Sequence, residues 1–152
     1  MAGEGAAFFV LSNQESGKNK AELRDMHTLY NPSNFKETES FVSTFLEKNS
    51  ISRNEIDLVV MGNNGDRRDQ AIYDELNKSV FNGLLQLAYK QYCGEYPTST
   101  SFAVWLATHI LENKTLPSWL LKDDGEQKPI KNLLIYNHYQ NKYHSLFLMK
   151  AC

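Results

Sequence analysis

The residues that could do chemistry gather in one short stretch, Lys90 to Glu95, which holds an amine, a thiol and a carboxylate. Cys93 lies between Lys90 and Glu95, and a cysteine can act as a nucleophile when a neighbouring base activates its thiol. No histidine lies close to Cys93 in the sequence, and an unpaired cysteine in a turn is more often structural. We therefore do not expect a catalytic nucleophile at this position.

The histidines form a second set of candidates. His109 falls on the apolar face of a helical pattern, so we expect it to be buried in the core. His138 and His144 lie on either side of a predicted turn and could share a metal ion, but no carboxylate or thiol completes a site at metal-ligand spacing. No metal or other cofactor is expected.

Composition limits the classes of partner. With 152 residues, the chain has the length of a single domain, 1–152. A net charge of −2 gives no electrostatic footprint for nucleic acid. No apolar run is long enough to span a membrane, and the N-terminus lacks the basic flank of a signal peptide. The two cysteines do not form a disulfide framework, so a cytoplasmic location is expected.

One helix should lie at the centre of the fold. It begins after the polar turn Lys90 to Pro97 and runs from Thr98 to Leu111, with apolar side chains around nearly its whole circumference. Such a helix is expected between two layers or at a subunit contact. Trp105 would then be buried, and Trp105→Ala would cost about 3–5 kcal/mol.

Other segments alternate between strand and helix patterns. Helices are predicted from Asn34 to Asn49, where Glu37 completes a capping box, and after Asp66. Six segments have strand character: Gly5–Ser12 (buried on both sides), Ala21–Tyr30 (near an edge), Ile56–Met61, Leu84–Tyr89, Leu133–Asn137 and Ser145–Met149. The order β-β-α-β-α-β-α-β-β predicts an α/β fold with a mostly parallel sheet that ends in a hairpin. Leu116–Lys131 is predicted to be a surface loop.

Several short motifs occur in the order typical of one family. They are Gly3-Glu4-Gly5-Ala6 before an apolar strand, Ile56-Asp57, Gly65-Asp66 with Asp69, Lys90-Gln91-Tyr92-Cys93-Gly94-Glu95, and Asn137. From Gly3 onward the chain resembles the C-terminal half of a β-ketoacyl synthase of the thiolase-like superfamily. The resemblance implies half of a thiolase-like fold, with a mixed, mostly parallel five-stranded sheet and one extra N-terminal strand.

The departures from that family concern its active site. The resemblance implies a cysteine nucleophile in an N-terminal half that this chain lacks, and two histidines that assist decarboxylation and stabilise the oxyanion. The first histidine should come just after the strand that begins at Ile56, but Met61 stands there and passes straight to Gly62, and Glu95 occupies the second position. A carboxylate there would repel the developing enolate. Asn137 to His144 contains no glycine-rich turn, and Lys90, although retained, has no partner to assist.

Two classes of function follow from this resemblance. The chain is either a non-catalytic structural, acyl-binding or carrier-protein-binding module of fatty-acid or polyketide synthesis, or one subunit of a split synthase whose cysteine comes from another polypeptide. A third reading is a fragment of a longer protein. We expect a homodimer, or a heterodimer with a thiolase-like half, formed through the Thr98–Leu111 helix, with acyl carrier protein as a further candidate partner.

Overall fold

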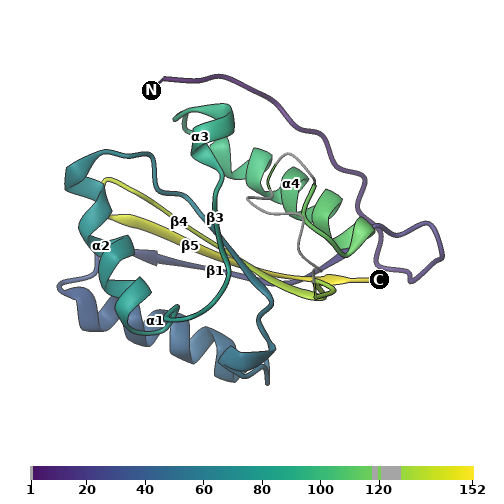
Figure 1. Ribbon diagram of the computed structural model, residues 1–152, viewed down its shortest axis with the longest axis horizontal. Coiled ribbons are helices and arrows are strands. Elements are labelled where there is room, and N and C mark those ends of the chain that lie inside the picture. Colours follow the sequence, from purple (N-terminus) through teal and green to yellow (C-terminus); the bar gives the residue numbers. More distant parts are fainter. Residues whose placement is uncertain (1, 118–119, 121–127) are drawn as a thin grey trace.

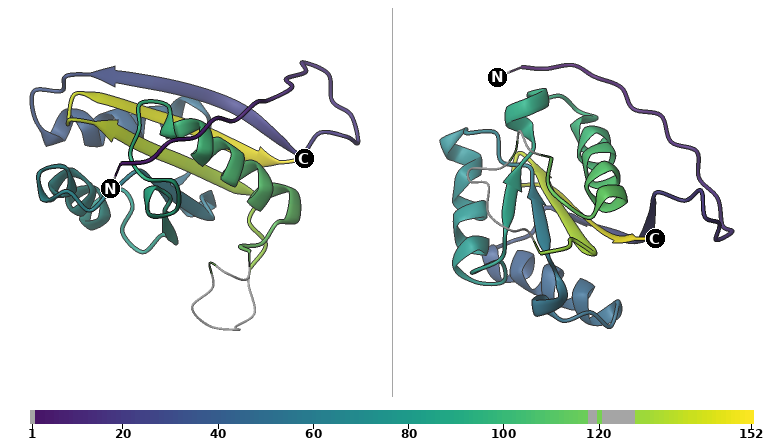
Figure 2. Two further views of the ribbon diagram at one scale, coloured as in Figure 1. Left: turned by 90° about the horizontal axis from the view of Figure 1, so that it is seen from above. Right: turned by 45° about the vertical axis from the view of Figure 1, so that its right-hand side comes forward.

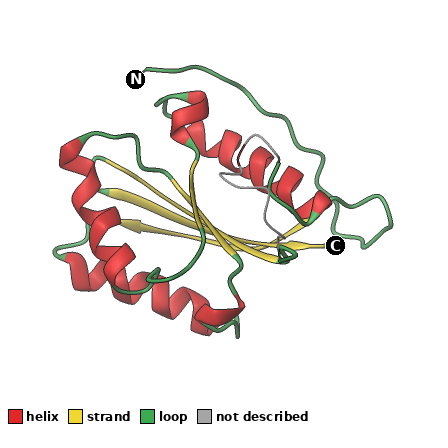
Figure 3. Cartoon of the chain, viewed as in Figure 1, coloured by secondary structure: helices red, strands yellow, loops and turns green. Residues whose placement is uncertain are grey.

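The chain folds into a five-stranded mixed sheet with helices on both faces (Figures 1 and 3). The structure is a computed structural model that describes residues 2–117, 120 and 128–152. The elements in this part of the chain are β1 (Ala21–Tyr30), α1 (Phe35–Lys48), a 3₁₀ helix (Arg53–Glu55), β2 (Leu58–Met61), α2 (Arg67–Lys78), β3 (Gln86–Ala88), α3 (Lys90–Cys93), α4 (Ser99–Asn113), β4 (Asn132–Tyr139) and β5 (Tyr143–Ala151). From Ala21 onward they follow the predicted order, and α3 lies inside the predicted turn.

The sheet has the strand order β1-β5-β4-β2-β3. β2 pairs in parallel with both β3 and β4, while β5 is antiparallel to β4 and to β1. Four strands therefore run in one direction and β5 runs against them. The predicted hairpin at the end of the chain is confirmed, and so is the predicted edge position of β1.

The position of β2 explains why the helices lie on both faces. From β2 the chain crosses to β3 on one side, and from β3 it returns past β2 to β4 on the other side. Crossovers between parallel strands are right-handed, so reversing their direction along the sheet moves the connecting helix to the opposite face. α2 accordingly lies with α1 on one face, and α4 covers the other (Figures 1 and 2).

Each face of the sheet has its own core. Val59, Leu134 and Leu148 pack toward α1 and α2. Leu58, Val60 and Ile135 point to the other side and pack toward α4. The alternation follows from the two-residue period of a strand. All four residues of β2 are buried, which confirms the central strand predicted over Ile56–Met61.

The predicted helix starts are also confirmed. The Asn34 side chain accepts a hydrogen bond from the backbone N–H of Glu37, and the Glu37 carboxylate accepts one from the N–H of Ser33. Asp66 caps α2 by accepting from the backbone N–H of Arg68 at 2.9 Å. The Asn34 and Asp66 side chains thus satisfy the backbone N–H groups of Glu37 and Arg68, which have no partner inside their helices.

The predicted N-terminal strand, Gly5–Ser12, is not formed. The segment is extended but joins no strand of the described sheet, and its side chains, among them Phe8 at 95% exposure, face solvent. The segment passes along the outer side of α4, which faces away from the sheet (Figure 2). A strand with no polar face needs neighbours to pair with and layers to cover it. The apolar run showed strand propensity but could not show whether this chain supplies such neighbours.

The prediction that α4 lies between two layers is also wrong, and the alternative, a subunit contact, stays a prediction. The helix packs one face on the sheet, through Ala103, Leu106, Ala107, Ile110 and Leu111. Trp105 is 48% exposed. The centroid of its ring lies 5.4 Å from the ring centroid of Phe102 and 6.1 Å from that of His109, and the Trp105 and His109 rings are stacked. His109, predicted to be a core residue, is itself exposed. A helix that is apolar all round does not reveal which side faces the sheet.

The predicted surface loop, Leu116–Lys131, falls largely on residues 118–119 and 121–127, outside the described part of the chain. Within the described part, no helix combines the length and apolar character needed to cross a lipid bilayer.

The orientation of α4 gives a testable prediction with an internal control. Leu106→Ala should lower the free energy of unfolding by about 2–5 kcal/mol, because it leaves a cavity against the sheet. In the monomer, Trp105→Ala should cost about 1 kcal/mol or less, because half of the side chain is already in water. Urea unfolding of both variants tests which face of α4 packs on the sheet. A larger loss of unfolding free energy for Trp105→Ala than for Leu106→Ala would show that the Trp105 face packs there instead.

Candidate functional site

The carboxyl ends of three parallel strands meet at one edge of the sheet. Met61, the last residue of β2, pairs with Ala88 of β3 and with Tyr136 of β4. The segments that follow these strands therefore lie side by side. In open α/β sheets, ligands bind beyond the carboxyl ends of the strands, where successive crossovers leave in opposite directions. β2 is such a position, because its neighbours β3 and β4 lie on either side of it.

The central contact at this edge is an ion pair between Lys90 and Glu95. Lys90 Nζ lies 2.7 Å from Glu95 Oε2, with side-chain exposures of 2% and 25%. The ammonium group is thus almost fully removed from water, whereas the carboxylate retains some solvent contact. An unpaired ammonium group would be costly to bury at this position, so Glu95 stabilises Lys90 in its charged form.

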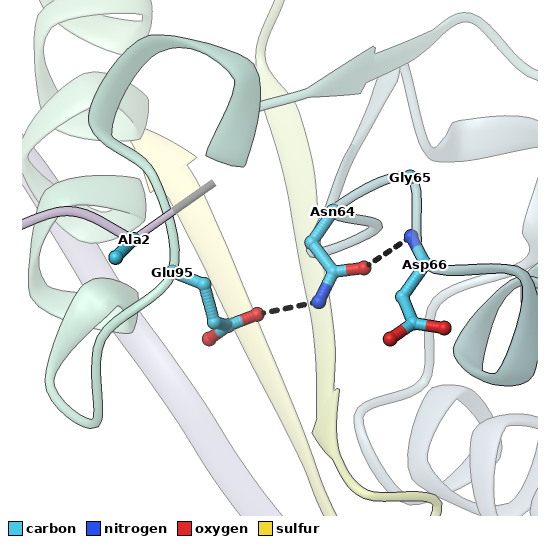
Figure 4. A pocket seen from close by; sticks show the side chains of 5 residues that line it. All are labelled: Ala2, Asn64, Gly65, Asp66 and Glu95. Atoms are coloured by element: carbon cyan, nitrogen blue, oxygen red, sulfur yellow. Dashed lines mark hydrogen bonds between the residues drawn. The ribbon is translucent and has the colours of Figure 1, made fainter.

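Asn64 connects this ion pair to the start of α2 (Figure 4). Its amide nitrogen donates to Glu95 Oε2 at 2.9 Å, and its Oδ1 accepts from the backbone N–H of Asp66 at 2.8 Å. These residues line an open pocket of ≈ 520 Å³, whose walls are Ala2, Asn64, Gly65, Asp66 and Glu95. Arg68 holds the pKa of Asp66 at about 2, mainly through a hydrogen bond to its carboxylate.

The N-terminal segment closes one side of the site through its backbone. Ala2 forms a parallel bridge with Glu95, and the N–H of Gly3 donates to the Glu95 carbonyl at 3.1 Å. Gly3 and Gly94 lie against each other so closely that a Cβ on Gly94 would come within 2.7 Å of the Gly3 Cα. Gly94 also has a φ of +76°, so glycine is required there for two reasons.

Met61 and Asn137 lie on the inner side of the site and have structural contacts. Met61 is buried in the core beneath α2. The Asn137 amide group lies directly against Gly62, where a Cβ would collide with it, and its nitrogen donates to Thr100 Oγ1 at 3.2 Å. Asn137 Oδ1 is buried and has no hydrogen-bond partner within the described residues.

Cys93 lacks the environment of an activated nucleophile. Its thiol is partly buried and lies 3.4 Å from the Gly94 carbonyl oxygen. Burial raises the pKa of the thiol above its usual value, which lowers the fraction of reactive thiolate.

The two buried histidines are His138 and His144, on β4 and β5. Their ring centroids are 5.4 Å apart, and burial lowers the pKa of His138 to about 4 and also depresses that of His144. His144 Nδ1 is hydrogen-bonded to the Tyr136 hydroxyl at 2.8 Å. The described residues contain no group of three or more side chains placed to hold a metal ion.

Of the residues singled out from the sequence, the structure joins Lys90 and Glu95 directly. Asn64 bridges them to α2 and was not among those residues. The available signal was its position directly after a buried strand, where polar side chains reach the carboxyl edge of the sheet.

Comparisons with known proteins support the fold alone. No family model matches this sequence, and no curated protein matches it. Among solved structures, the chain is similar to the noncanonical ketosynthase FabY from P. aeruginosa, with a TM-score of 0.57 and 11% sequence identity. The match covers 87% of this chain and 26% of that chain. The chain therefore has a fold similar to part of that ketosynthase and spans about a quarter of its length.

The ion pair predicts asymmetric effects of mutation. Glu95→Gln should lower the free energy of unfolding by about 3 kcal/mol, because it leaves a buried ammonium group without a counterion. Lys90→Met should cost less, since the more exposed Glu95 can be hydrated, and the double variant should recover most of the loss. Urea unfolding of the unmodified chain, the two single variants and the double variant measures these free energies. If the losses of the two single variants simply add in the double variant, Lys90 and Glu95 are not coupled.

Proposed function

We propose that this chain is a ketosynthase-like module of fatty-acid or polyketide synthesis that does not catalyse condensation by itself. The observation that supports this most directly is the Lys90–Glu95 ion pair. By resemblance to β-ketoacyl synthases, Glu95 stands where a histidine would donate a hydrogen bond to the developing oxyanion. An ionised carboxylate only accepts hydrogen bonds, and here one of its oxygens is already bound by Lys90 and Asn64.

The surroundings of the ion pair support the same proposal. By the same resemblance, Met61 stands where the first histidine would be, and Gly62 follows it directly. Asn137 lies against that glycine and occupies the space beside it. Lys90, which the resemblance places in the synthase site, neutralises Glu95 and has a structural role. The module would then act as a structural partner, or by binding an acyl chain or its carrier protein.

The test of this proposal is direct. The purified chain should neither condense acyl and malonyl thioesters nor release CO₂ from malonyl-carrier protein above background. Glu95→His alone should remain inactive, because one added histidine supplies neither the nucleophile nor the first histidine. Decarboxylation well above background that is lost in Lys90→Met would contradict the proposal.

The alternative is a split synthase in which another polypeptide supplies the cysteine. It is favoured by the exposed apolar residues around α4: Phe8, Val10 and Leu11 of the N-terminal segment, and Trp105 of the helix. Condensing activity that appears only when this chain is mixed with a thiolase-like polypeptide carrying a cysteine nucleophile would favour this alternative.

For the module itself, we expect a second copy of this chain to cover that surface. Thiolase-like halves pack about a pseudo-twofold axis in the family that the chain resembles, and two identical halves could reproduce it with a true twofold axis. The contact would involve Phe102 and Trp105. Leu111, which the sequence also suggested for this contact, is fully buried against the chain's own sheet.

Light scattering at micromolar concentration tests this oligomeric state. The unmodified chain should have the mass of a dimer, and Trp105→Glu should shift it to a monomer without loss of fold. Thr115→Glu, an exposed position outside the apolar surface, is the matched control and should remain dimeric. A monodisperse monomer for the unmodified chain would exclude the homodimer and leave a heterologous thiolase-like half as the partner to test.

A further inference from the structure

The turn between β4 and β5 is tied to the first turn of α2 by two side chains. His138 Nε2 lies 3.2 Å from the carbonyl oxygen of Asp69, and the Asn141 amide nitrogen donates to the carbonyl of Arg68 at 3.1 Å. The two side chains also contact each other, because the backbone N–H of Asn141 donates to His138 Nδ1 at 3.3 Å. In the described part of the chain, these hydrogen bonds join the hairpin tip to the helix.

These contacts determine the protonation state of the imidazole ring. The Asn141 N–H can only donate, so His138 Nδ1 must accept and carries no proton. The Asp69 carbonyl can only accept, so Nε2 must carry the proton. Both hydrogen bonds therefore form together only with the neutral ring. In the imidazolium ion both nitrogens are donors, and Nδ1–H would face the N–H of Asn141.

The environment of the ring also disfavours the charged form. His138 is 2% exposed, and its ring stacks on that of Tyr73 from α2 at 4.6 Å. The other ionisable groups that act on it are His144 from β5, Tyr136 on its own strand, and Lys90 from α3. Burial raises the pKa of Tyr73 and of Tyr136, so both stay neutral, and His144 and Lys90 can carry only positive charge; none of the four provides an anion that would stabilise a cation at this position.

The first turn of α2 is also part of the pocket. Asp66 caps this turn and lines the pocket, and its backbone N–H donates to Asn64. Asn64 donates in turn to Glu95, which pairs with Lys90. A continuous series of contacts thus leads from His138 through the start of α2 to the ion pair, part of which is visible in Figure 4.

We propose that His138 is a pH-sensitive latch. In its neutral form, His138 holds the β4–β5 turn against the first turn of α2. Protonation of His138 releases the β4–β5 turn and loosens the Asn64–Asp66 wall of the pocket. Two conformations are required, closed with the neutral ring and locally open with the ring hydrated. Protons bind the open form more tightly and shift the population toward it. This release requires neither an acyl substrate nor a second copy of the chain.

The direction of the pH effect follows from linkage. The ordinary pKa of an exposed histidine is 6.5, and burial lowers that of His138 to about 4 in the closed form. Between these values the open form binds one more proton than the closed form. The latch is therefore fully stabilising above pH 6.5, and its stabilisation is lost progressively as the pH falls toward 4.

Amide hydrogen exchange of the full chain, followed by NMR and normalised to intrinsic rates, tests the proposal. Protection of the Asn141 amide and of the amides in the first turn of α2 should fall by up to about tenfold per pH unit below pH 6.5. His138→Gln should abolish this dependence, because glutamine can donate and accept at the same place but does not titrate. His144→Gln is the comparison variant: it removes a histidine that lowers the pKa of His138, so the pH dependence at Asn141 should persist, with its midpoint moved to higher pH.

If His138→Gln does not fold, the unmodified chain still provides a test. The ring resonances of His138 and the amide shift of Asn141 should titrate together, with a midpoint near 4. Titration of His138 near 6.5, protection at Asn141 that does not change with pH, or unchanged pH dependence in a folded His138→Gln variant would each overturn the proposal. A purely structural role would lower stability equally at every pH and leave the pH profile unchanged.

Discussion

The arrangement of this molecule depends on β2. Its four residues are buried on both faces, and it pairs in parallel with a strand on either side. Because parallel crossovers have one hand, two crossovers that leave β2 in opposite directions must place α2 and α4 on opposite faces. The same geometry brings the segments after β2, β3 and β4 together at one edge. The pocket therefore lies where the topology alone would place a ligand, whatever residues line it.

At that edge, burial of the Lys90 ammonium group constrains its neighbours. A lysine with 2% side-chain exposure requires an anion within reach, and Glu95 supplies it from the loop after α3. Asn64 uses its remaining polar group to fix the cap of α2. The polar residues of the site thus mainly satisfy one another.

Local rules were sufficient to predict most of the elements from the sequence. The caps at Asn34 and Asp66, the buried strand before Gly62 and the final hairpin depend on contacts within a few residues, which the sequence displays. The orientation of α4 depends instead on what it packs against. Ala103 and Ala107 permit a close approach to the sheet, whereas Trp105 is too large for that face. Apolar character alone could not separate these two sides.

The candidate site could be predicted only in part for a similar reason. Lys90 and Glu95 are close in sequence, and the α3 turn brings them together. The partner of His138, in contrast, is a backbone carbonyl on α2, and no pattern of side chains indicates such a contact. His109, which was expected in the core, is exposed, whereas His138, for which the sequence indicated only a place beside a turn, is buried.

The exposed N-terminal segment is fixed at both of its ends. Gly3 is hydrogen-bonded to the Glu95 backbone and packed against Gly94, and the chain enters β1 at Ala21. Two fixed ends limit the paths that an extended segment can take, and the segment stays on the α4 side of the molecule (Figure 2). Because the first anchor is the backbone of Glu95, a partner that moves this segment would pull directly on the ion pair and the pocket.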